Sequence, residues 1–111
     1  MAEARLAAGI WVAAYLRRLM LADIPAYVIR HGDDTAGSVM VKCATLDGQA
    51  SLWAREWDLD SDQRLWIELG RGEERDIDAQ TARAVARDPD LWLIEIESRD
   101  GRTLLDQAGL A

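Results

Sequence analysis

Large apolar residues recur at three- and four-residue spacing near the start of the chain. Within residues 9–22 they gather on one side of a helical wheel, opposite Arg17, and Pro25 follows soon afterwards. A second stretch, residues 76–87, has acids near its start and arginines near its end, as the helix dipole favours. The sequence therefore predicts two helices, over 9–22 and 76–87.

Five further segments are typical of strands, because they are rich in aliphatic, β-branched and aromatic residues and are separated by turn-forming stretches. We expect strands over residues 26–31, 38–46, 49–57, 64–69 and 91–97. The pair Asp47-Gly48 separates the second strand from the third and predicts a hairpin between them.

Segments 27–29, 39–41 and 91–94 are apolar on both faces, which is typical of strands covered above and below. Segments 49–57 and 64–69 instead alternate between apolar and polar residues, as half-exposed strands do. The expected fold is a single α/β domain over residues 1–111, with a mixed sheet of about five strands and the two helices on opposite faces. A two-layer α+β arrangement is the alternative.

Composition agrees with one folded domain, because 50% of the 111 residues are apolar and 30% are charged. The formal net charge of −7 arises entirely after residue 57, where 14 acids face seven bases. Such an acidic chain repels phosphate backbones, so we do not expect general nucleic-acid binding.

The longest apolar stretch, residues 6–16, is too short to span a bilayer as a helix. The pair Arg17-Arg18 follows this stretch, where a signal peptide would have a cleavage site of small residues. The single cysteine, Cys43, has no partner for an internal disulfide. We expect a cytoplasmic protein that does not associate with membranes.

Polar and basic side chains of the first helix and of the first two strands are candidates for ligand binding. They are Arg17, Arg18, Arg30, His31, Asp33 and Lys42. An imidazole beside carboxylates suits acid–base chemistry, and basic groups suit a phosphorylated or nucleic-acid ligand. The segment from His31 to Asp34 is equally typical of a polar turn at a strand end. An enzyme would require His31 and Lys42 to meet in one pocket.

Asp58, Asp60 and Asp62 alternate as the first ligands of a calcium loop do. Gln63 stands where that loop needs glycine, and Leu69 stands where it needs a bidentate glutamate. An acidic turn is therefore the better interpretation, and we expect neither a metal nor a cofactor.

Three residues of the first helix fall outside its main apolar stripe. They are Ile10, Trp11 and Ala14. Apolar residues on an outer face commonly mark an interface, so this set predicts a homodimer contact.

Several segments together resemble the bacterial domain-of-unknown-function 1491 family across nearly the whole chain. They include Gly9-Ile10-Trp11-Val12, Tyr15-Leu16-Arg17-Arg18, Pro25-Ala26-Tyr27-Val28, Asp88-Pro89-Asp90-Leu91-Trp92 and Gly101-Arg102-Thr103-Leu104-Leu105. The resemblance implies a small cytoplasmic protein with a three-layer α/β fold, and it carries over no catalytic residue.

No nucleotide-binding loop, nucleophile elbow or zinc motif occurs in the sequence, so the recognisable enzyme classes are excluded. The function is unknown from the sequence. The preferred hypothesis is a non-catalytic binding or accessory domain that associates with itself. The alternative is an enzyme or binder that uses a basic sheet face and the turn from His31 to Asp34 on a phosphorylated or nucleic-acid ligand.

Overall fold

Two helices and five strands follow one another in a computed structural model that describes residues 6–110. The order along the chain is α1 (Ala8–Leu21), β1 (Ala26–Arg30), β2 (Val39–Ala44), β3 (Gln49–Asp58), β4 (Gln63–Glu73), α2 (Glu74–Arg87) and β5 (Trp92–Glu97). Each predicted element is present. The largest difference is at β4, which continues four residues beyond the predicted end at residue 69.

The five strands form one mixed sheet in the order β1-β5-β2-β3-β4. β5 runs parallel to β2, and the other neighbouring strands are antiparallel. β2 and β3 form the expected hairpin around Asp47-Gly48, where Gly48 adopts a φ of 86°. β1 and β4 are the two edges of the sheet, so each has a neighbouring strand on one side only.

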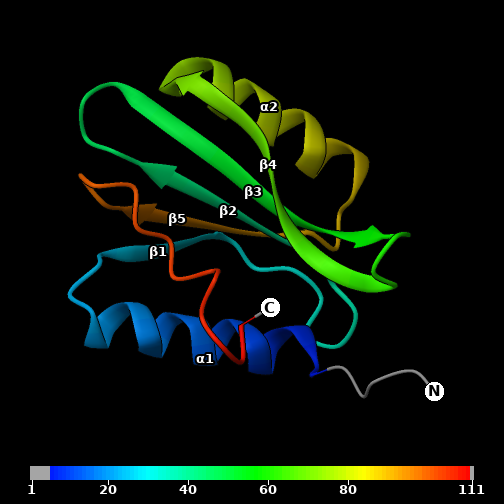
Figure 1. The fold of residues 1–111 in the computed structure, drawn as a ribbon. Helices are drawn as coiled ribbons and strands as arrows, with labels where there is room; N and C mark the ends of the chain where they lie inside the picture. The colour runs from blue at the N-terminus through cyan, green and yellow to red at the C-terminus, as the bar shows by residue number, and fades with distance from the viewer. Residues whose placement is uncertain (1–5, 111) are drawn as a thin grey trace.

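The helices cover opposite faces of the sheet, which confirms the three-layer prediction (Figure 1). α1 buries Trp11, Tyr15 and Leu19 against alternate residues of β2 and β5, including Val41 and Ile94. α2 packs on the other face through one stripe, including Ile77 and Ala84. This alternation follows from the two-residue period of strands covered on both sides.

The prediction that residues 27–29 are covered on both faces is wrong. Tyr27, Val28 and Ile29 are 49%, 42% and 55% exposed, because β1 is an edge strand and α2 contacts β3 and β4 instead. β2 and β5 lie inside the sheet and are covered as expected.

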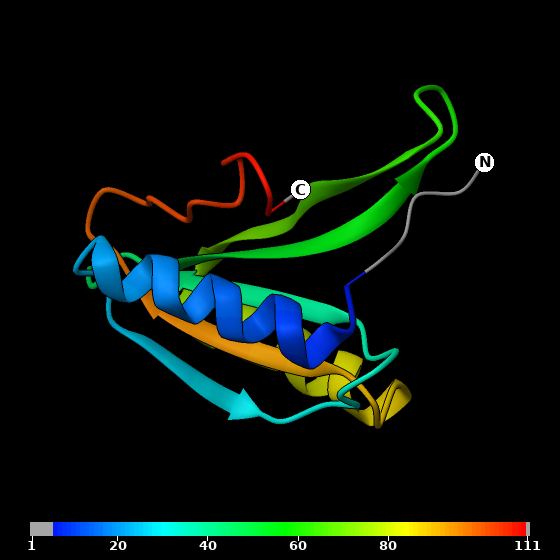
Figure 2. The ribbon, with the colours of Figure 1, turned by 90° about the horizontal axis from the view of Figure 1, so that it is seen from below.

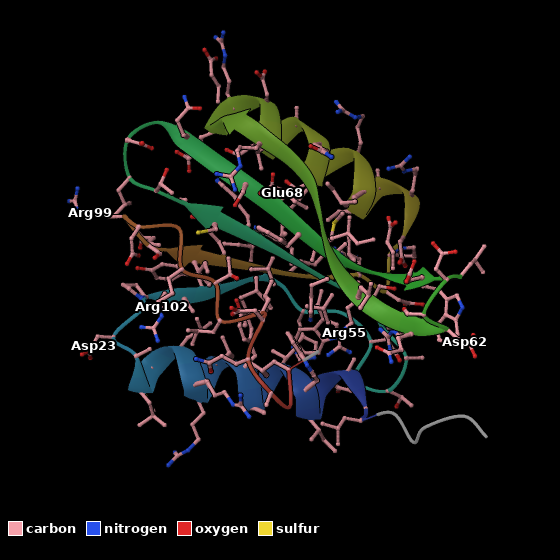
Figure 3. The ribbon with its side chains drawn as sticks, viewed as in Figure 1. Asp23, Arg55, Asp62, Glu68, Arg99 and Arg102 are labelled. Carbon is pink, nitrogen blue, oxygen red and sulfur yellow. The ribbon has the colours of Figure 1, made fainter. Side chains whose placement is uncertain are left out.

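Two segments extend the molecule beyond the layers. The β3–β4 hairpin projects from the body, and its tip carries Asp62 (Figures 2 and 3). After β5 the chain runs without helix or strand across the α1 side of the sheet (Figure 1). Leu110, the last described residue, contacts Trp11 of α1. No helix within residues 6–110 is both long and apolar enough to cross a membrane.

Candidate functional site

Lys42 lies in the middle of β2 on the face covered by α2, and only 4% of its side chain is exposed. Its ammonium group donates to Glu74 Oε1 at 2.8 Å and to Asp78 Oδ1 at 2.6 Å, and lies 3.0 Å from Glu95 Oε1. Burial alone lowers the pKa of Lys42, but the hydrogen bonds to Asp78, Glu74 and Glu95 outweigh burial and raise it. Lys42 is therefore charged and fully occupied by its three carboxylate partners.

The turn after β1 is held together by its own polar groups. Asp33 Oδ2 accepts hydrogen bonds from the backbone N–H groups of Thr35 and Ala36, at 3.1 and 2.7 Å. His31 Nε2 lies 3.0 Å from Asp34 Oδ1, and both side chains are largely exposed. This geometry is that of a polar turn closed by an aspartate side chain.

His31 and Lys42 lie on opposite sides of the sheet. The His31 ring packs 4.0 Å from the ring of Trp92, which belongs to the core beneath α1. Lys42 instead contacts Glu74 and Asp78 of α2. The two groups do not share a pocket, so the geometry required for the alternative hypothesis of an enzyme is missing among the described residues.

The predicted arginines are also separated from one another. Arg30 Nη2 donates to the Pro89 carbonyl at 2.8 Å, and Arg18 Nη1 donates to the Ala108 carbonyl at 2.6 Å. Arg17 is exposed on the outer side of α1. The structure therefore does not gather the six predicted ligand residues into one site.

Among the surface clefts that residues 6–110 form, two are the best defined, and none of those six residues lines either of them. One, of about 350 Å³, lies where β5 ends, and Asp23, Arg99 and Arg102 are among its lining residues (Figure 3). The other, of about 250 Å³, is lined by apolar residues such as Met40 and Leu91 and by charged residues such as Arg87.

The acidic turn at the tip of the β3–β4 hairpin is organised by a serine. Asp58 Oδ2 accepts from the Ser61 hydroxyl at 2.6 Å and from the Ser61 N–H at 3.0 Å, and these bonds lower the pKa of Asp58. Asp60 and Asp62 are exposed. No group of three metal-ligating side chains is arranged to hold an ion within residues 6–110.

The predicted interface set divides in two. Ile10 is 60% exposed and Ala14 is exposed, so both can reach another molecule. Trp11 is only 3% exposed, and its indole stacks 4.9 Å from the ring of Tyr15 in the core. A contact through this face of α1 would therefore depend on Ile10 and Ala14.

The open edge of β1 is a surface that local sequence patterns do not predict. Tyr27, Val28 and Ile29 form a continuous exposed apolar run along it. Glu97 accepts a hydrogen bond from the Tyr27 hydroxyl and also carries a negative charge. Both effects raise the pKa of the Tyr27 phenol. Three consecutive apolar residues are present in the sequence, but the strand order decides whether they are buried or exposed.

The model of a family described as a protein of unknown function, DUF1491, matches residues 6–106. The chain belongs to the DUF1491 family. A DUF1491 family protein from Caulobacter crescentus CB15, solved as a crystal structure, is 41% identical, with 92% of this chain and 94% of that chain covered and a TM-score of 0.80.

An NMR structure of a DUF1491 family protein from Caulobacter crescentus CB15 gives 42% identity, 94% and 96% coverage and the same TM-score. Protein Atu0922 from A. tumefaciens is 28% identical, with 86% and 87% coverage and a TM-score of 0.72. A search of curated proteins finds no match. DUF1491 membership therefore establishes the fold and no activity.

Proposed function

We propose that this DUF1491 protein is a non-catalytic interaction domain of the bacterial cytoplasm, and that it forms a homodimer by pairing β1 with β1 of a second copy. The observation that carries the proposal is the open β1 edge, where Tyr27, Val28 and Ile29 are 49%, 42% and 55% exposed. An uncapped apolar edge strand is a template for pairing with another chain.

The backbone of β1 shows which groups are available for pairing. Glu97 N–H donates to the Pro25 carbonyl, and bonded positions alternate along an antiparallel ladder. Tyr27 therefore bonds to β5, whereas the N–H and C=O groups of Ala26 and Val28 point to the open edge. Ile29 falls at the register shift between Val28 and Arg30, which ends the regular pairing surface.

Antiparallel pairing centred on Tyr27 uses these open groups fully. Ala26 of each copy then bonds to Val28 of the other, and the two Tyr27 rings face each other across the two-fold axis. Aromatic cross-strand pairs stabilise sheets. Residues 26–29 carry no charged side chain, which suits contact between two molecules of net charge −7.

Sedimentation at high micromolar concentration tests the proposal, together with Val28→Pro. Proline lacks the N–H that would bond to the second copy, and this N–H makes no bond within the monomer. We expect the unmodified chain at twice 12.4 kDa and Val28→Pro at 12.4 kDa. Circular dichroism verifies that the variant remains folded.

Ile10→Lys is the matched control, because Ile10 is also an exposed apolar residue but lies on α1. It should dimerise like the unmodified chain. If Ile10→Lys lost the dimer while Val28→Pro retained it, the interface would lie on α1 and not on β1. A monomer at every concentration would overturn self-association altogether.

A further inference from the structure

The segment after β5 is held both through its backbone carbonyls and through buried leucine side chains. The Tyr15 hydroxyl donates to the Thr103 carbonyl at 2.9 Å, and Arg18 donates to the Ala108 carbonyl at 2.6 Å. Leucine side chains anchor the segment, and they are all at most 4% exposed: Leu104, Leu105 and Leu110. α1 and the β3–β4 hairpin thus hold an irregular peptide segment as a peptide-binding protein holds its ligand.

Three donors converge on one oxygen at the end of this segment. The Leu110 carbonyl oxygen accepts from Trp11 Nε1 at 3.3 Å, from Arg55 Nη2 at 2.9 Å and from Trp66 Nε1 at 2.8 Å. We call Trp11, Arg55 and Trp66 the cradle. A carbonyl oxygen has two lone pairs, so three donors exceed what this neutral acceptor can use well.

The cradle is also positively charged and fixed in geometry. The Arg55 guanidinium lies 4.8 Å from the Trp11 ring centroid and 5.1 Å from the Trp66 ring centroid. The two rings are themselves 5.2 Å apart, and Arg55 lies between the sheet and α1 (Figure 3). A guanidinium held against two aromatic rings has its planar orientation fixed, which suits recognition of a carboxylate.

We infer that the cradle is a carboxylate-binding site for the terminal carboxylate of a peptide that ends in an aliphatic residue. Residues 106–110 of the chain occupy this site as an internal substitute. The buried Leu110 side chain marks where the terminal aliphatic residue of the ligand would lie. This site lies on the α1 side of β3 and β4 and does not depend on pairing of β1.

Gly109 sets the backbone conformation near the end of the segment. Gly109 has a φ of 86°, and a Cβ added there would lie 2.8 Å from Arg18 Nη2. Gly109→Ala therefore strains the backbone and displaces the Arg18 contact while leaving all three cradle residues in place. The substitution therefore weakens the hold on residues 106–110 without changing any residue of the cradle.

The test uses nitrogen-15-labelled Gly109→Ala protein and two acetylated peptides with the sequence of residues 106–110. One peptide ends in a free carboxylate and the other in an amide. The indole N–H resonances of Trp11 and Trp66 report occupation of the cradle. We expect both resonances to shift, with half-saturation at a roughly tenfold lower concentration for the free acid, because a charge-assisted hydrogen bond replaces a neutral one.

Arg55→Gln in the same background should remove the preference for the acid, and Trp66→Phe should weaken acid binding while keeping an aromatic ring. Arg71→Gln is the control, because Arg71 is an exposed arginine of β4 that pairs with Glu68. A chain truncated after Leu105 repeats the test without competition from the tail. Equal affinity for acid and amide, or no indole shift in any folded form, would overturn the inference.

Discussion

Replacing Lys42 with methionine removes the most buried charge found among the described residues while keeping a side chain of similar length. The ammonium group makes three contacts with carboxylates, at 2.6, 2.8 and 3.0 Å. Hydrogen bonds to charged groups contribute about 1.5–3 kcal/mol each, so the gross loss is several kcal/mol.

Two effects reduce that loss. Glu74, Asp78 and Glu95 are 40%, 56% and 27% exposed, so water screens their attraction and rehydrates them when the lysine is gone. Methionine also avoids the cost of burying the ammonium group. We therefore expect Lys42→Met to lower the free energy of unfolding by about 2 kcal/mol, and the melting temperature by roughly 8 °C.

Urea unfolding followed by tryptophan fluorescence measures this loss. Arg75→Met is the matched control, since it removes the Arg75–Glu73 pair, whose side chains are 84% and 56% exposed. That control should change stability by less than about 0.5 kcal/mol.

The pKa of Lys42 is raised in the folded protein, so its contribution is complete at any pH below the ordinary lysine pKa and fades as the pH rises above it. The difference between the unmodified chain and Lys42→Met should therefore be constant from neutral pH to about pH 10 and shrink beyond it. A Lys42→Met protein as stable as the Arg75→Met control would refute this reasoning.

Three further predictions concern other parts of the molecule. Gly32→Ala should destabilise the protein by about 2 kcal/mol in urea unfolding, because a Cβ there would lie 2.3 Å from the Asp90 carbonyl oxygen and 2.7 Å from the Trp92 nitrogen. Cys43 is fully buried, and burial raises the pKa of its thiol, so a thiol reagent should modify it only after unfolding. Rising ionic strength should strengthen the dimer measured by sedimentation, because salt screens the repulsion between two chains of net charge −7; weakening by salt would indicate ion pairs at the interface.

Local sequence patterns predicted the helices and strands well, because the spacing of apolar residues within each segment differs between a helix and a strand. α1 and α2 begin within two residues of the predicted positions, and their apolar stripes face the sheet as expected. β4 is longer than predicted because Gly70 and Gly72 interrupt its alternation, although both pair with β3. The position of β1 at the edge depends on strand order, which local periodicity does not encode.

The role of Lys42 was partly readable from the sequence. A lysine within an apolar strand needs partners, and Glu74 and Asp78 are four residues apart, which places them on one helical face. No comparable spacing in the sequence indicates that the three cradle residues meet. Trp11, Arg55 and Trp66 come from α1, β3 and β4, and only the folded chain brings them to the carbonyl of Leu110.

Amide hydrogen exchange of β1, followed residue by residue at several protein concentrations, tests the proposed dimer most directly. The Val28 amide points to the open edge, whereas the Tyr27 amide bonds to β5. The proposed pairing predicts that protection of Val28 grows with protein concentration while protection of Tyr27 stays nearly constant. Val28 exchange that is fast at every concentration would contradict it.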